Sequence, residues 1–138
     1  MNEALLNTMD FPYEEFGAGI MRLIRLIASP HTTGEGRLSL VYATIPPGAV
    51  SEGHVHPDFD EYIFFESAGR AVLDGENLEV PAKAVLHAKA GVKHECVNIS
   101  ADSDLGLFCV FVPPLKPYGK YDSLIEKTNA YLKNISQS

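Results

Sequence analysis

Short apolar runs, broken by Gly, Pro, Asn or Asp, follow one another along the chain from Gly19 onward. Runs of this length, rich in β-branched and aliphatic side chains and separated by turn residues, are typical of an antiparallel sandwich or barrel. Helical periodicity is almost absent until the C-terminal end. The pattern predicts an all-β fold with strands at residues 20–28, 37–45, 50–56, 61–67, 70–73, 76–80, 84–88, 94–99 and 105–112.

Turn residues support this division into strands. Asp74-Gly75 stands between two apolar runs, and an Asp-Gly pair favours a two-residue type I′ hairpin because glycine accepts the positive φ that this turn needs. Pro46-Pro47-Gly48 marks another junction between strands.

The pattern changes after Pro113-Pro114. Ser123 and Glu126 are spaced as a helix-capping box, and apolar positions then recur at helical spacing. This predicts a C-terminal α-helix at about 123–135 that packs on the barrel. Its apolar face consists of Leu124, Ile125, Thr128, Tyr131, Leu132 and Ile135. The first nineteen residues allow a short helix, an extra strand or an arm that reaches a neighbouring subunit.

Length and composition indicate one domain over residues 1–138, with the barrel core at about 19–112. A chain of 138 residues and 15.1 kDa is long enough for one hydrophobic core and short for two. Hydrophobic residues make up 46% and charged residues 21%, as in ordinary soluble globular proteins. The sequence contains no internal repeat and no linker.

Charge and cysteine usage exclude several classes of partner. A net charge of -7 and a pI near 5.1 would repel a phosphate backbone, so we expect no nucleic-acid partner. Residues 1–10 lack a secretion signal, and no apolar run reaches membrane-spanning length, so we expect a cytoplasmic protein without a membrane partner. Cys96 and Cys109 match no metal or redox spacing and are expected as buried thiols in a reducing compartment.

A candidate metal site comes from three histidines and one glutamate. His54 and His56 are two residues apart, so their imidazoles would share one face of an extended strand. Residues 57–60 then form a turn, and Glu61 begins a returning strand that brings its carboxylate beside them. His94 follows a Gly91-Val92-Lys93 turn and is the best fourth ligand.

The chemistry of this set favours one divalent transition metal ion. Neutral imidazoles bind borderline ions well, and a single carboxylate leaves coordination positions open for water, dioxygen or substrate. Thiolate and all-oxygen calcium sites do not match the sequence, which leaves iron, manganese, nickel, cobalt, copper or zinc. The alternative is that His54 and His56 are solvated residues near Glu52, Asp58 and Asp60, because such pairs also arise by chance.

Together these residues resemble the cupin superfamily. The first motif of that family is similar to Gly48, His54, His56 and Glu61, and the second is similar to Gly91, His94 and Asn98. Residues 69–76 resemble the hairpin between the motifs, so the resemblance spans residues 19–112. It implies a small single-domain, metal-binding cupin: a double-stranded β-helix with the metal inside near one mouth. It also implies a homodimer and an inward face shared by His94, Cys96 and Asn98.

The chain departs from the family pattern at several positions. Ala68 stands where the family usually has glycine, and Gly69 comes one residue later. If the strand is one residue shorter than usual, Asp60 would replace Glu61 as the carboxylate ligand; we favour Glu61. Lys83 replaces a usual glycine and Lys89 a usual proline, so the turn before His94 is expected to differ in shape.

Other residues with chemical potential have simpler interpretations. His87 is expected to face outward or to be partly covered, and His31 to be a solvated loop residue. Arg22, Arg25 and Tyr42 interrupt the first two apolar strands and could line the mouth, where they would anchor an acidic or hydroxylated substrate. The aromatic residues are expected in the core rather than in a ligand box: Phe59, Tyr62, Phe64, Phe65, Phe108 and Phe111.

The expected function is that of a mononuclear metalloenzyme acting on a small polar organic substrate, with oxygenase-like or related chemistry. The alternatives are a metal-dependent sugar isomerase, epimerase or lyase, and a non-enzymatic small-molecule-binding cupin. Vacant coordination positions favour catalysis over a structural metal. No helix-turn-helix segment is present, so a transcriptional regulator is not expected.

Overall fold

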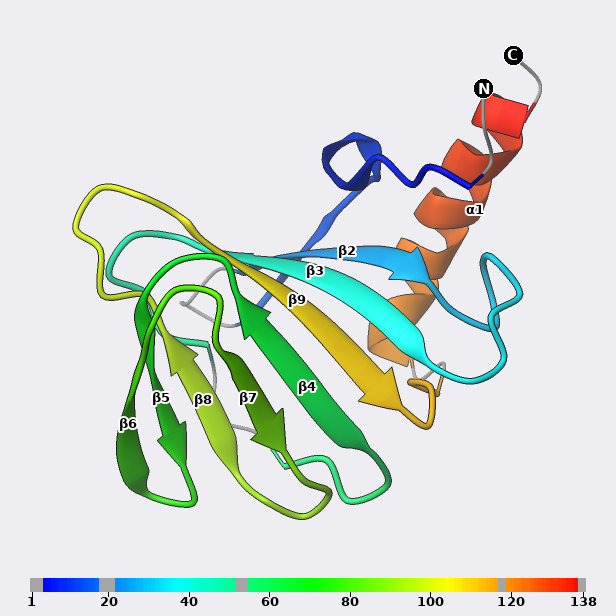
Figure 1. Ribbon diagram of the computed structural model, residues 1–138. Coiled ribbons are helices and arrows are strands. Elements are labelled where there is room, and N and C mark those ends of the chain that lie inside the picture. The colour runs from blue at the N-terminus through cyan, green and yellow to red at the C-terminus, as the bar shows by residue number, and fades with distance from the viewer. Residues whose placement is uncertain (1–3, 18–21, 52–54, 117–118, 137–138) are drawn as a thin grey trace.

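The computed structural model describes residues 4–17, 22–51, 55–116 and 119–136. Two antiparallel sheets face each other and enclose the core (Figure 1). One has six strands in the order β1-β2-β3-β9-β4-β7, and the other has three in the order β6-β5-β8. The elements are η1 (Thr8–Asp10), β1 (Glu14–Phe16), β2 (Arg22–Ala28), β3 (Ser39–Ile45), β4 (Asp60–Phe65), β5 (Gly69–Leu73), β6 (Glu76–Val80), β7 (Val85–Ala88), β8 (His94–Val97), β9 (Leu105–Val112), η2 (Gly119–Tyr121) and α1 (Asp122–Ser136). The all-β prediction with a C-terminal helix is confirmed.

Alternation along the strands fills the space between the sheets. In β9, residues 105, 107, 109 and 111 are buried while those at 108, 110 and 112 are more exposed, as expected for a strand with one face on the core. Phe65 and Leu105 are completely buried in the centre. The predicted hairpin is also confirmed, because Asp74 and Gly75 both have positive φ angles, 52° and 84°, as a type I′ turn requires.

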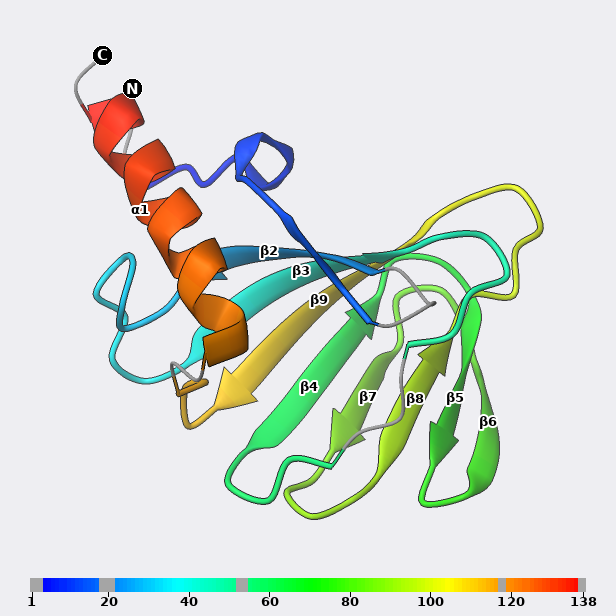
Figure 2. The same ribbon diagram turned by 180° about the vertical axis from the view of Figure 1, so that it is seen from behind.

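The helix α1 packs against β2, beside the N-terminal segment (Figure 2). Leu124 and Thr128 are fully buried on the predicted apolar face, and the ring of Tyr131 lies 4.8 Å from that of Phe11. The prediction of a capping box at Ser123 and Glu126 is wrong. The helix begins at Asp122, and the Ser123 hydroxyl donates to the Glu14 carboxylate rather than capping the helix. No helix in the described ranges is long and apolar enough to cross a membrane.

One predicted strand needs correction. Of the residues expected in the strand at 50–56, those that the structure describes form only an isolated bridge, between Val50 and Val97, and residues 52–54 lie outside the described residues. The cause is visible at Ser51, whose N–H donates to the Cys96 carbonyl while its hydroxyl accepts from the Cys96 N–H. A side chain thus replaces a backbone carbonyl as acceptor at this point of the ladder. Near the N-terminus, an extra strand forms at Glu14–Phe16, one of the three options that the sequence allowed.

Two of the positions at which the sequence departs from the motif pattern have distinct backbone surroundings. A Cβ atom at Gly69 would lie 2.9 Å from the Val97 carbonyl oxygen and 3.0 Å from the Phe65 ring, so glycine is needed at this position. Lys83 has a φ of 70°, which is unusual for a residue with a side chain. Its N–H donates to the Phe65 carbonyl at 2.7 Å, which holds it beside the end of β4.

Candidate metal centre

Three of the four predicted ligands meet inside the barrel. The donor atoms of His56, Glu61 and His94 all lie within 4.8 Å of one another. Glu61 Oε1 is 3.0 Å from His94 Nε2 and 3.4 Å from His56 Nε2. The side chains of Glu61 and His94 are only 5% and 2% exposed, and that of His56 is 21% exposed. The fourth predicted ligand, His54, lies outside the described residues.

These side chains come from separate elements that backbone contacts hold together. Glu61 is the second residue of β4 and faces inward, opposite Phe111 of β9. His94 is the first residue of β8 and is equally buried. His56 lies in the loop before β4, and its carbonyl accepts from the N–H of Gly91 at 2.9 Å. Gly91 has a φ of 84°, a conformation natural to glycine, so this turn joins the two motifs.

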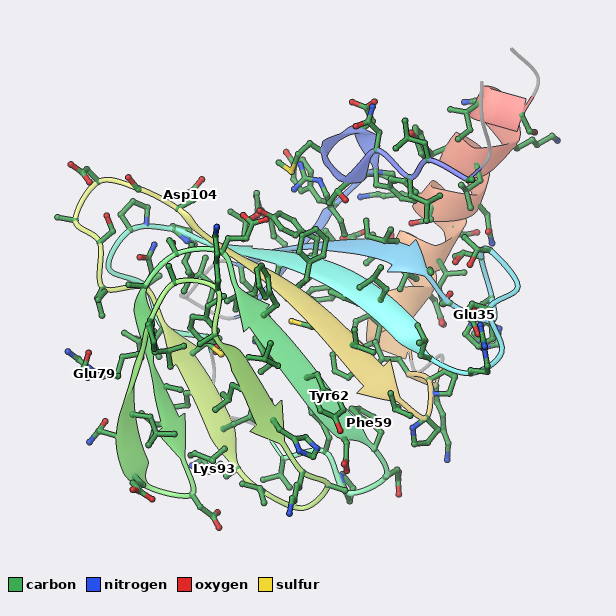
Figure 3. The ribbon with its side chains drawn as sticks, in the orientation of Figure 1. Glu35, Phe59, Tyr62, Glu79, Lys93 and Asp104 are labelled. Carbon is green, nitrogen blue, oxygen red and sulfur yellow. The ribbon has the colours of Figure 1, made fainter. Side chains whose placement is uncertain are left out.

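Aromatic rings fix the orientation of the His56 imidazole. Phe59 stacks on it with ring centroids 4.5 Å apart, and Phe111 meets it edge-on at 5.8 Å. Figure 3 shows Phe59 near the start of β4. The two phenylalanines therefore pack the site and shield it from water, as expected for core residues rather than for an open aromatic box.

The hydrogen bonds of His94 favour a cation between His94 and Glu61. Its Nδ1 lies 3.3 Å from the Val92 carbonyl oxygen, and its Nε2 lies 3.0 Å from the Glu61 carboxylate. Both partners are acceptors, and a neutral imidazole has one N–H to donate. If Nδ1 donates to the carbonyl, Nε2 carries a lone pair that points toward the carboxylate. A metal ion between the two groups would bind that lone pair, as in metal sites where a backbone carbonyl orients the histidine.

Two of the three donor separations match those around a metal ion. With metal–ligand bonds of about 2.1 Å, neighbouring ligands lie roughly 3.0 Å apart at right angles and roughly 3.4 Å apart at tetrahedral angles. The two measured distances from Glu61 Oε1 are 3.0 and 3.4 Å. The third separation, between the two imidazoles, extends up to 4.8 Å, more than the roughly 4.2 Å that two ligands at about 2.1 Å can span, so a bound ion would draw the imidazoles closer together. Two imidazole nitrogens and one carboxylate oxygen suit a borderline divalent ion. The residues present therefore fit the metal that the fold family implies.

A cavity of about 380 Å³ adjoins the three candidate ligands. This volume lies toward the small end of the range for ligand pockets, roughly 300–1,000 Å³. Much of its wall is aliphatic, and the remaining polar groups of the lining are few. These additional polar or sulfur-containing residues are Arg22, Ser51, Cys96, Cys109 and Tyr121.

Both cysteines are free thiols in the wall of this cavity. Burial, and then the negative charge of Glu61, raise the pKa of Cys96 to about 12. The same two causes raise the pKa of Cys109 well above its ordinary value, and its thiol also hydrogen-bonds with Glu61. The thiols therefore stay protonated at neutral pH, as buried and unreactive groups.

The second choice for the carboxylate ligand, Asp60, lies on the outer face of the sheet. Its carboxylate is 2.9 Å from His87 Nε2 and accepts from the Ala90 N–H at 2.9 Å. The Ala90 N–H and then His87 lower the pKa of Asp60. The His87 ring stacks on Tyr62 at 4.2 Å, so His87 faces outward as predicted. His31 is exposed, as expected for a loop residue.

Among the three residues proposed to line the mouth, the structure brings one to the cavity. Arg22 lines it. Arg25 lies on the other face of β2, where its Nε donates to the Phe11 carbonyl and its guanidinium lies 5.1 Å from the Tyr13 ring centroid. Tyr42 also faces away and donates to Glu66. The expectation that Arg25 and Tyr42 could line the mouth is wrong. Strand alternation places both side chains on the outer face of the sheet, whereas Arg22 and Ile24 lie on the inner face.

Asn98 and Tyr121 have places that the sequence did not fully predict. Asn98 is buried with His94 and Cys96, as expected, but its amide lies within hydrogen-bonding distance of the carbonyls of Ile45, Pro46 and Ser103. It therefore supports the loops rather than the cavity.

Tyr121 was not predicted as a cavity residue, because it precedes the helix and belongs to no strand pattern. Cys109 is buried as predicted, but its place in the cavity wall was not predicted, although it alternates in phase with the buried positions of its strand.

No family model and no curated protein matches this chain. Its fold nevertheless matches solved structures. A predicted oxalate decarboxylase from Thermotoga maritima has a TM-score of 0.69 and 16% identity over 79% of this chain and 98% of its own. KdgF from Halomonas sp. has a TM-score of 0.65 and 19% identity over 81% and 94%. An RmlC-like cupin from Shewanella frigidimarina has a TM-score of 0.63 and 18% identity over 81% and 92%. These likenesses establish the jelly-roll fold.

Proposed function

We propose that this chain, which has the fold of the cupin superfamily, binds one divalent transition metal ion and uses it in chemistry on a small organic molecule. The observation that carries the proposal is the convergence of His56, Glu61 and His94 on the wall of an internal cavity of about 380 Å³. His54 is proposed as the fourth ligand from its place in the sequence. The ion is iron, manganese, nickel, cobalt, copper or zinc.

Each part of the site has a role in this proposal. Glu61 offsets part of the charge of the ion, and the Val92 carbonyl orients His94 for binding. Phe59 and Phe111 hold His56 and exclude water from that side. When bound, the metal would supply a Lewis acid with open coordination positions. The aliphatic wall would keep the reaction away from bulk solvent, where electrostatic interactions are weaker.

The open positions favour an enzyme over a protein with a structural metal. Structural sites are closed by four protein ligands, commonly including several thiolates, whereas the donor set among the described residues consists of two imidazoles and one carboxylate. We propose oxygenase-like or related metal chemistry. Turnover in air but not under nitrogen would support an oxygenase. Oxygen-independent turnover would instead indicate a lyase or isomerase, and no turnover across a panel of small acids and sugars would favour a binding protein.

The experiment that tests metal binding is elemental analysis of the full chain, purified without chelators and without added metal. We expect near-stoichiometric metal in the wild type and its loss in His56→Ala and His94→Ala. His87→Ala is the matched control, because His87 is also a paired histidine but lies on the outer face. It should retain the metal.

Circular dichroism of each variant shows whether it is folded, so that a loss of metal is not confused with unfolding. Glu61→Gln provides an isosteric alternative if either alanine variant fails to fold. Wild-type metal content in both His56→Ala and His94→Ala would show that these residues are not the ligands. Absence of metal from the wild type, even after incubation with each candidate ion, would overturn the proposal.

A further inference from the structure

Arg22 places a positive charge at the wall of the cavity. It is the first residue of β2, pairs in register with Phe16 of β1, and lines the cavity together with Ile24. Its Nε is buried and has no hydrogen-bond partner among the described residues. A buried polar group without a partner is costly, and a charged group more so. Nη1 of Arg25 is equally without a partner among the described residues, but Arg25 lies on the outer face, whereas Arg22 faces a cavity in which a ligand could complete its hydrogen bonds.

The electrostatics of the lining residues show that the charge of Arg22 acts inside the barrel. Burial raises the pKa of Tyr121, and the charge of Arg22 opposes this rise. Arg25 has no comparable role, because its guanidinium is bound to the N-terminal segment on the outer face.

The charges around the cavity favour an anion. Of the described lining residues, Glu61 alone carries a carboxylate and Arg22 alone carries a permanent positive charge. With a divalent ion bound and the other groups neutral, the site would carry a net charge of roughly +2. The chain as a whole has a net charge of -7, but exposed charges are largely screened beyond about 8 Å at physiological ionic strength. The attraction inside the cavity therefore dominates for a bound ligand.

The rest of the wall limits the ligand further. Aliphatic side chains cover much of the lining: Ile24, Val41, Ala43, Ile45, Ile63 and Leu107. The polar groups of the lining share the wall about equally with these side chains, so a ligand here meets both a charged group and apolar surface. A short carbon skeleton that carries a carboxylate offers both.

We propose that the cavity binds a small organic carboxylate that carries a second oxygen, as in a 2-hydroxy or 2-oxo acid. Arg22 binds the carboxylate, and the second oxygen approaches the metal. A planar guanidinium matches a carboxylate with two parallel hydrogen bonds. The metal-facing half of this inference rests on the proposed function, whereas the contact with Arg22 does not.

The test measures equilibrium binding by NMR titration of the metal-loaded full chain, with a diamagnetic ion such as Zn²⁺. The ligands are lactate, pyruvate, malate and 2-oxoglutarate, and lactamide serves as the neutral counterpart of lactate. We expect at least one acid to bind with a Kd below about 10 mM. Lactamide should bind at least about 10-fold more weakly than lactate if the charge is recognised, since hydrogen bonds to charged groups are the stronger ones.

Three variants identify the residue responsible. Arg22→Gln should weaken binding of the acid by about 10-fold to 100-fold, as expected when a charged hydrogen-bond partner is lost. Arg22→Lys keeps the charge without the fork-shaped geometry and should give an intermediate loss. Arg37→Gln is the matched control: it changes the net charge equally, but Arg37 is a loop residue whose side chain is 86% exposed and paired with Glu35. It should bind the acid like the wild type.

The outcomes separate this inference from the metal proposal. If none of the acids binds, or if Arg22→Gln binds the acid as tightly as the wild type, the inference is overturned even when metal content is full. If the chain takes up no metal but binds the acid in an Arg22-dependent way, the metal proposal fails and the contact with Arg22 stands. Because Arg22 is not a candidate ligand, metal content should stay at the wild-type level in Arg22→Gln.

Discussion

Replacing Glu61 by glutamine should remove most of the stabilisation that metal gives to the fold. Glu61 is 4% exposed, and its Oε1 is the atom nearest to both imidazoles in the cluster. Glutamine has nearly the same shape but lacks the negative charge that attracts the ion. The substitution therefore tests the ligand role with little change in packing.

The size of the effect follows from linkage between binding and folding. A ligand present at 100 times its Kd stabilises the folded state by about 2.7 kcal/mol. For a chain of 138 residues, an unfolding entropy of about 2.1 cal/mol/K per residue converts this into a rise in Tm of roughly 9 °C. If the substitution weakens binding about 100-fold, the same metal concentration gives about 0.4 kcal/mol, or a rise of roughly 1–2 °C.

The assay is thermal unfolding followed by circular dichroism, with chelator and with metal at a fixed concentration. For each variant, the Tm with metal is compared with the Tm of the same variant with chelator, so any change in the stability of the metal-free protein cancels. Glu79→Gln is the control, because Glu79 lies on the exposed β6 and pairs with Arg70 at the surface. A rise in Tm for Glu61→Gln as large as that of the wild type would refute the assignment of this carboxylate.

Three further predictions follow from the packing around the barrel. Gly106→Ala should destabilise the fold by about 1–3 kcal/mol in urea unfolding, because a Cβ there would overlap the Tyr42 hydroxyl and the Glu66 carboxylate. An unchanged urea midpoint would contradict this close approach of Tyr42 and Glu66 to the Gly106 backbone. Asp60→Asn should lower stability at neutral pH but not in acid, because the pKa of Asp60 is lowered by the Ala90 N–H and by His87. The stabilisation from its ionised form is present above the ordinary pKa of 3.8 and is lost as the pH falls through the lower folded pKa. A difference from the wild type that stayed constant as the pH was lowered through the acid range in urea titrations would argue against it. Both thiols should react with a thiol reagent only after unfolding, since burial raises the pKa of each; rapid labelling of the native chain would show that they are accessible.

The parts of the fold that the sequence predicted are those where local patterns determine structure. The Asp74-Gly75 turn needs positive φ at both positions, and these two residues adopt it. The helical face around Leu124 was readable because apolar residues recur at the helical period. The isolated bridge at Val50 was not readable, because the Ser51 hydroxyl replaces a backbone acceptor there and the apolar pattern carries no signal for this contact.

The candidate site likewise contains residues that the sequence predicted and residues that it did not. The longer motif spacing favoured Glu61 over Asp60, and the structure brings Glu61 to the two histidines. The choice between Arg22 and Arg25 was not readable, because both interrupt one apolar run and the face of each depends on the register of β2 with β1 and β3. Tyr121 reaches the cavity from η2 through tertiary packing against Phe16, for which the sequence carries no local signal.

The most direct test of the central claim is a crystal structure of the metal-loaded protein with anomalous diffraction at the absorption edge of the ion. We expect one strong anomalous peak inside the barrel, within about 2.0–2.2 Å of the ring nitrogens of His56 and His94 and of a Glu61 oxygen. The same map would show whether His54 is the fourth ligand. A peak elsewhere, or no peak from a crystal grown with the ion in excess, would contradict a metal centre at these residues.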